Sequence, residues 1–172
     1  MQLVKKIIIG VGLTLAVSIV GFYALNSYIY TEKQGEVEIF PDGVHFGFIR
    51  AMTDNGTAID FDDAVWLTGA EGEAAAMRAQ RCTPDTKDDC LPNGYFIENI
   101  SRDTKRVPVG DNATVILVTW RMDETGEVRE STSTLPVFEA LINNPEMHWN
   151  KLPYVITVEQ NKIVRIHERY IP

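Results

Sequence analysis

The chain has few of the residues from which catalytic and metal centres are built. Only 2 of its 172 residues are cysteine and 3 are histidine. His45, His148 and His167 lack the spacing of metal ligands, and the two cysteines lack the C-x-x-C spacing of a redox pair. No stretch matches a catalytic or cofactor-binding motif. The sequence therefore predicts a protein that is not an enzyme and holds no cofactor.

Positive charge is also scarce, because 16 Lys and Arg residues stand against 24 Asp and Glu residues, for a net charge of -8. Lys5 and Lys6 belong to the N-terminal segment, and without them 14 basic residues face the same 24 acidic ones. An acidic surface repels phosphate backbones and anionic lipid headgroups. The composition therefore disfavours a nucleic-acid partner and flat docking on a membrane.

One long apolar run directly follows these lysines. Residues 7–25 carry no charge and reach roughly 28 Å as a helix, close to the hydrocarbon thickness of a bilayer. Lysines that flank such a run stay in the cytoplasm. We predict a cytoplasmic segment over residues 1–6, a single membrane-spanning signal anchor over residues 7–29, a tether over residues 30–43 and an extracytoplasmic domain over residues 44–172.

A cleaved signal peptide is the alternative, because its charged start and apolar core look similar. The apolar core of a signal peptide usually has about 7 to 15 residues, which is shorter than this run, and no clean A-x-A cleavage site follows. Tyr23, Tyr28 and Tyr30 lie where an aromatic belt meets the outer interface of the membrane. These features favour an anchor that is retained in the cell membrane.

Cys82 and Cys90 enclose a short acidic loop and are the only cysteines of the chain. In an exported domain, such a close and even pair is expected to be oxidised. By the chain-entropy account, so short a loop contributes roughly 2 to 3 kcal/mol. We therefore predict a structural disulfide that fixes a local excursion of the chain.

Alternating apolar residues predict several short strands. The predicted strands span residues 44–52, 58–62, 95–100, 114–120, 127–132, 154–159 and 163–170. Residues 114–120 are apolar on both faces and are expected to form the most buried strand. Gly47, inside the first strand, indicates a bulge or a close backbone approach.

The first of two predicted helices spans about residues 69–80. Thr68 and Glu71 have the spacing of a capping box, in which a hydroxyl and a carboxylate satisfy the first free amide groups of a helix. The helical period places three residues toward the core, namely Ala70, Ala74 and Met77.

The second predicted helix begins near Thr134, with Pro136 in its first turn. Its inward residues are expected to be Leu135, Phe138, Leu141 and Ile142. Together these elements predict an α+β fold, with a mainly antiparallel β-sheet that is curled toward a small barrel, two short helices and one preceding transmembrane helix.

Asp60, Asp62 and Asp63 form the strongest acidic cluster. Strand alternation places Asp60 and Asp62 on one face, and paired carboxylates can bind Ca²⁺ or Mg²⁺ or serve acid–base chemistry. A solvent-exposed strand face is the other interpretation, because no EF-hand loop is present. No metal site is assigned, and these three aspartates are the candidates for one.

His148 and Trp149 lie between Pro145 and Pro153 and are candidates for the lining of a small pocket. Aromatic residues in loops also cap hydrophobic cores. Both interpretations stay open at this point.

Four segments of the predicted domain carry a resemblance to other sequences. They are residues 61–69 (FDDAVWLTG), 90–97 (CLPNGYFI), 148–150 (HWN) and 170–172 (YIP). These segments resemble a group of uncharacterised bacterial exported domains, which are small chains that are anchored at the N-terminus or secreted. The resemblance implies a bacterial cell envelope, and it brings no activity and no functional residue with it.

The leading hypothesis is a membrane-tethered, non-enzymatic binding or structural module whose partner is an envelope protein or a cell-wall ligand. A second hypothesis is a metal-dependent hydrolase or a calcium-dependent module that uses Asp60, Asp62 and Asp63. A third is an accessory subunit of a membrane complex. The sequence alone identifies neither the ligand nor the partner.

Overall fold

The computed structural model describes residues 39–171 apart from 84, 87–89 and 123–125. These residues belong to one compact unit, Ile39–Pro172. The predicted membrane helix and most of the predicted tether lie outside the described residues. Among the residues that are described, no helix is both long and apolar enough to cross a membrane.

Strands, short helices and 3-10 turns follow one another along the chain. In order they are β1 (Gly43–Thr53), η1 (Asp54–Gly56), β2 (Ala58–Thr68), α2 (Gly69–Arg78), β3 (Tyr95–Glu98), β4 (Lys105–Leu117), β5 (Ser131–Ser133), α4 (Leu135–Ile142), η3 (Trp149–Lys151), β6 (Pro153–Glu159) and β7 (Lys162–Glu168). The described strands form a 7-stranded sheet in the order β3-β2-β1-β6-β7-β4-β5. Its pairs are antiparallel except for β4 with β7. The predicted α+β class and the mainly antiparallel sheet are confirmed.

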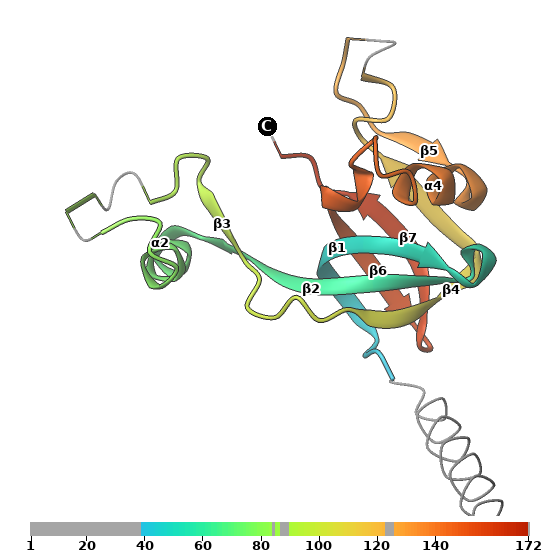
Figure 1. Ribbon diagram of the computed structural model, residues 1–172, viewed down its shortest axis with the longest axis horizontal. Helices are drawn as coiled ribbons and strands as arrows, with labels where there is room; N and C mark the ends of the chain where they lie inside the picture. Colours follow the sequence, from blue (N-terminus) through green and yellow to red (C-terminus); the bar gives the residue numbers. More distant parts are fainter. Residues whose placement is uncertain (1–38, 84, 87–89, 123–125, 172) are drawn as a thin grey trace, which may run out of the picture. The chain divides into compact units, whose positions relative to one another are not determined.

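An additional pairing between β2 and β4 closes part of this sheet into a barrel. Around the barrel the order is β1, β2, β4, β7, β6 and back to β1, with β4 and β7 parallel (Figure 1). Helix α4 lies in the connection between the third and fourth barrel strands, β4 and β6. This arrangement is the topology of the OB fold, a five-stranded Greek-key barrel.

Strand alternation fills the barrel with apolar side chains. Ile59 and Phe61 of β2 are fully buried, and each barrel strand contributes in the same way. Phe138 of α4 meets Tyr154 of β6 edge to face, with ring centroids 5.6 Å apart, so the helix is packed onto the barrel. Full burial of one such side chain is worth about 1.5–3 kcal/mol, which makes this core the main source of stability.

Phe40, the second described residue, is part of this core. Phe40 is 3% exposed, and its ring centroid lies 5.8 Å from that of Phe61. The Phe40 N–H donates to Asn161 Oδ1 (2.9 Å), and the Asn161 N–H donates to Asp42 Oδ1 (2.9 Å). The folded part of the chain therefore includes residues before position 44, where we expected it to begin.

An excursion between β2 and β4 carries α2, the disulfide and β3; we call residues 69–104 the insertion. β2 pairs with β4 along its first part and with β3 along its last part, Val65–Thr68. Figure 1 shows α2 and β3 extending away from the barrel along this continuation of β2. Trp66 stacks on Tyr95 (centroids 3.9 Å apart) and lies under the guanidinium of Arg169 (4.9 Å), which ties the insertion to the last described residues.

Gly47 allows β1 and β2 to approach closely. A Cβ at this position would overlap the backbone carbonyl oxygen of Asp62. The close backbone approach that we predicted at Gly47 is therefore confirmed.

Helix α2 begins at the predicted residue and buries a different face. Its buried residues are Gly72, Ala75 and Ala76. A Cβ at Gly72 would lie 3.0 Å from the carbonyl oxygen of Leu67, so glycine lets this side of the helix approach β2. The prediction that Ala70, Ala74 and Met77 face inward is wrong for this reason.

The starts of the two helices differ from each other. Thr68 makes no capping hydrogen bond, because it is still the last residue of β2 and pairs with Tyr95, so the predicted capping box is wrong. Helix α4 has a proline in its first turn, as predicted. The predicted inward residues of α4 are also confirmed, since Phe138, Leu141 and Ile142 are buried and Leu135 packs against the core.

Strand β4 begins at Lys105 and includes Pro108, well before the predicted start at residue 114. Buried and exposed residues alternate along it, because only one face of a barrel strand points inward. The prediction that residues 114–120 form the most buried strand is wrong for that reason.

Candidate functional site

A groove of about 1140 Å³ lies between the barrel and the insertion. Its barrel wall comes from β1 and β2, through Phe48, Arg50 and Asp62. Its other wall comes from Arg78, the last residue of α2, with the three residues that follow it, and from residues 96–100 and Arg102. We call it the arginine groove, after the four arginines that line it, Arg50, Arg78, Arg81 and Arg102.

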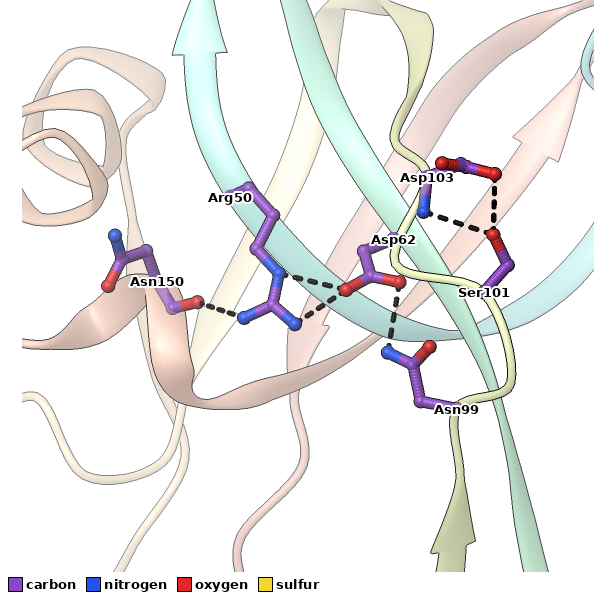
Figure 2. A network of polar contacts seen from close by, with 6 residues as sticks. All are labelled: Arg50, Asp62, Asn99, Ser101, Asp103 and Asn150. Carbon is purple, nitrogen blue, oxygen red and sulfur yellow. Dashed lines mark hydrogen bonds and ion pairs between the residues drawn. The ribbon is translucent and has the colours of Figure 1, made fainter.

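Asp62 is 1% exposed and is held by partners from two other parts of the chain. Arg50 donates from Nε (2.9 Å) and Nη2 (2.5 Å) to Asp62 Oδ2, and Asn99 Nδ2 donates to Oδ1 (2.9 Å). Arg50 Nη1 also donates to the carbonyl oxygen of Asn150 (3.2 Å). Figure 2 shows how this network joins β1, β2, η3 and the chain after β3 at one carboxylate.

The burial of this carboxylate follows from an interruption of the sheet. β3 ends at Glu98 and β4 begins at Lys105, and both strands pair with β2. The residues between them, 99–104, stand opposite only residues 62–64 of β2, so they bulge outward. We call residues 99–104 the bulge segment. Bulges re-aim side chains, and this one directs Asn99 onto the buried carboxylate.

The amide of Asn99 is only half satisfied. Its Nδ2 donates to Asp62, whereas its Oδ1 is buried and has no hydrogen-bond partner among the described residues. Turning the amide over would bring that oxygen against the carboxylate. A buried acceptor without a donor costs about 1–3 kcal/mol, and such groups call for a specific explanation.

The remaining arginines of the groove differ in their partners. Arg78 Nη2 lies 2.8 Å from Glu98 Oε1. Within the described part of the chain, the guanidinium groups of Arg81 and Arg102 make no hydrogen bond and no ion pair. Four arginines against the carboxylates of Asp62 and Glu98 leave the groove with excess positive charge in an acidic chain.

This arrangement can bind an anion. A guanidinium presents a planar fork of N–H groups that fits carboxylate and phosphate oxygens. Arg50 is held in place by its ion pair with Asp62 and by the Phe48 ring, whose centroid lies 4.5 Å from its Cζ, and its Nε, Nη1 and Nη2 already donate to Asp62 and Asn150. The charged groups among the described lining residues are the four arginines and the carboxylates of Asp62 and Glu98.

The three aspartates that we singled out have separate surroundings. Asp60 accepts a hydrogen bond from Arg106 Nε (3.2 Å), Asp62 is enclosed by Arg50 and Asn99, and Asp63 is exposed. Asp60 and Asp62 are thus each paired with an arginine. Across the described ranges, no group of three or more His, Cys, Asp or Glu residues could hold a metal ion.

His148 and Trp149 do not line the arginine groove. Trp149 is 7% exposed and belongs to the hydrophobic core, and its carbonyl oxygen accepts a hydrogen bond from the Tyr154 hydroxyl (3.0 Å). His148 is exposed and takes a left-handed backbone conformation before η3. For Trp149, capping of the core is what the structure shows.

The disulfide between Cys82 and Cys90 is present, as predicted, with the two Cα atoms 5.2 Å apart. Its first cysteine, Cys82, directly follows Arg81, which lines the groove. Disulfides form and persist in oxidising compartments, so this bond is consistent with an extracytoplasmic domain.

Sequence reasoning missed the arginines of the groove. They come from β1, from the end of α2 and from the bulge segment, and nothing in their spacing connects them. The only available signal was that basic residues are scarce outside the N-terminal segment, which makes any local cluster of them unusual.

No protein-family model, no curated protein and no solved structure matches this chain. The OB topology does not supply a function, because one fold carries many activities. Many OB folds bind oligonucleotides on the face of their second and third strands. Here Asp60 of β2 pairs with Arg106 of β4 on these strands, and Asp54 lies 3.8 Å from the same arginine. What the groove can do follows from its own side chains.

Proposed function

We propose that this chain is a protein of the cell envelope, tethered to the membrane by residues 7–29, whose extracytoplasmic OB-fold domain binds an anionic ligand in the arginine groove. The observation that carries the proposal is that, among the described residues, the guanidinium groups of Arg81 and Arg102 have no partner, beside the ion pairs of Arg50 and Arg78. Both side chains are exposed, and a local excess of positive charge in an otherwise acidic chain attracts anions.

Two further observations support the setting. The disulfide suits an oxidising compartment, and the apolar run after Lys5 and Lys6 has the length and flanking charge of an anchor.

Binding is tested with the full-length protein in non-ionic detergent and two labelled probes, a short polyacrylate and a polyphosphate. Charge-assisted hydrogen bonds are worth about 1.5–3 kcal/mol each. Replacing both unpaired arginines (R81Q with R102Q) is therefore expected to weaken binding at least about tenfold, as read by fluorescence anisotropy. Binding should also weaken between about 50 mM and about 500 mM salt, because salt screens exposed charges.

The matched control is R129Q with R165Q, which removes the same charge from two exposed arginines outside the groove. An equal loss of affinity in the control would mean that net charge, and not the groove, attracts the probe. Absence of binding to either probe would contradict the proposal.

The tether is tested by fractionation of cells that express the chain. We expect the protein to stay with membranes after alkaline extraction and to keep its full mass, with the domain open to protease added from outside. A mass that lacks the N-terminal segment would show that the segment is a cleaved signal peptide.

A further inference from the structure

We infer that the anionic ligand is an acidic peptide segment, bound in extended form beside the bulge segment. This inference rests on the proposed function and adds the chemical class of the ligand and its mode of binding.

The bulge segment has main-chain groups that are available to a ligand. The ladder of β3 ends at Glu98 and that of β4 starts at Lys105. Among the described residues, the main chain of 99–104 forms no backbone-to-backbone hydrogen bond and contains no turn or helix. The Asp103 N–H is engaged, because it donates to Ser101 Oγ (3.1 Å), as Figure 2 shows. Residues 100–104 are exposed. Unpaired N–H and C=O groups that continue a strand are a template onto which an extended peptide adds as a further strand.

Apolar groups accompany the arginines. Ile100 is 89% exposed, and the aromatic ring of Phe48 and the side chain of Ile97 line the same groove. In an added strand, alternate side chains point to opposite faces. A peptide can therefore direct carboxylates toward Arg81 and Arg102 and use its remaining side chains against the apolar residues.

The groove needs donors as well as acceptors, which favours a peptide over a phosphate. Asp62 and Glu98 bring negative charge to the groove, and Asn99 Oδ1 lacks a donor. A phosphate group has acceptor oxygens and no N–H group, so it satisfies only the arginines. A peptide brings carboxylates and N–H donors together. Asn99 belongs to the bulge segment and is held by its bond to Asp62, so the N–H donors of the peptide meet the exposed main chain of residues 100–104.

The test compares four probes on the full-length protein in non-ionic detergent. They are a short peptide of alternating glutamate and valine, the same peptide with N-methylated valines, a polyacrylate with the same number of carboxylates, and a polyphosphate. N-methylation removes main-chain donors and leaves the charge unchanged. We expect the first peptide to bind about tenfold more tightly than the other three, and R81Q with R102Q to remove most of this binding.

Hydrogen exchange gives a second readout that charge alone would not move. The peptide should slow exchange of the amides of residues 99–104, whereas polyacrylate should not. Equal affinity of the peptide and its N-methylated copy, or tighter binding of polyphosphate, would overturn the inference and leave anion binding by the arginine groove intact. Absence of binding to all four probes would overturn the proposed function as well.

Discussion

The barrel and the arginine groove each bury one carboxylate, and the hydrogen-bond partners of the two carboxylates differ in kind and in exposure. Glu168 of β7 is 2% exposed and accepts hydrogen bonds from the N–H groups of Val118 (2.6 Å) and Thr119 (3.0 Å) and from the Thr119 hydroxyl (2.5 Å). These donors belong to Val118 and Thr119, the two residues that directly follow β4. Asp62, by contrast, depends on Arg50, which is 37% exposed, and on Asn99, which is itself half satisfied. The hydrogen-bond donors to Glu168 are used up within the fold. Asp62 lies at an open groove, which the N–H groups of further arginines also line.

Tyr154 shows the same closed character of the barrel. Burial, together with the nearby negative charge of Glu168, raises the pKa of the Tyr154 phenol well above its ordinary value. The phenol therefore stays neutral and keeps donating to the Trp149 carbonyl oxygen (3.0 Å). The polar groups here act on one another and are not available to a ligand.

The largest expected effect is that of Glu168→Ala. It leaves two N–H groups and a hydroxyl without their acceptor, and at about 1–3 kcal/mol for each unsatisfied group we expect a loss of about 4 kcal/mol in the free energy of unfolding. Urea unfolding followed by tryptophan fluorescence measures it. Glu130→Ala, which removes a 64% exposed partner of His167, is the control and should change stability by less than about 1 kcal/mol. Similar losses in both variants would remove the distinction between the two carboxylates.

Next comes removal of the disulfide by Cys82→Ser with Cys90→Ser. A loop this short contributes roughly 2 to 3 kcal/mol by the chain-entropy account. Because the bond lies within the insertion, we expect faster hydrogen exchange in α2 and unchanged exchange in β6 and β7. Equal loss of protection in the barrel would show that the two regions unfold together.

Asp62→Asn has a smaller effect on stability and a distinctive effect on binding. Because Arg50 is partly exposed, the lost ion pair should cost only about 1–2 kcal/mol. The guanidinium of Arg50 is then no longer neutralised, so affinity for polyacrylate should rise severalfold. Asp60→Asn removes a carboxylate paired with Arg106 and should leave the affinity unchanged. A fall in affinity for the Asp62 variant would mean that this carboxylate only holds the groove in shape.

The smallest effect is expected at Asp42, on the rim of the barrel. Hydrogen bonds from the backbone N–H groups of Asn161 and then Gln160 lower the pKa of its carboxyl below the ordinary value of 3.8. A lowered folded pKa contributes stability above the unfolded pKa, and the contribution is lost as pH falls through the folded pKa. Asp42→Asn should therefore be slightly less stable than the parent at neutral pH and equally stable in strong acid. Urea midpoints measured across this pH range test it, and a difference that persists in acid would contradict it.

Periodicity was enough to predict the elements that pack by regular alternation. The hairpin of β6 and β7 and the inward face of α4 follow from apolar spacing alone, because these elements meet the core in a regular way. The face of α2 could not be found by the same means. Gly72 is its closest contact to β2, and a residue without a side chain carries no weight in a hydrophobic pattern.

The arginine groove was beyond sequence reasoning for a different reason. It exists because β3 and β4 share one partner strand and the bulge segment between them is longer than the stretch of β2 that it faces. Pairing partners decide that geometry, and they are not local properties of a sequence. Asp62 therefore looked like one of three solvent-facing aspartates, whereas it is enclosed by Arg50 and Asn99.

The seating of Phe40 has a mechanical consequence. If the residues before Ile39 hold the domain to a membrane, a force that pulls on the domain acts on the barrel first through the buried ring of Phe40. The load then passes through the Phe40 N–H and the Asp42 carboxylate to Asn161, at the tip of the β6–β7 hairpin. The same residues lead directly into β1, which begins at Gly43 and carries Phe48 and Arg50, so a force at Phe40 acts both on the β6–β7 hairpin and on the strand that forms one wall of the arginine groove.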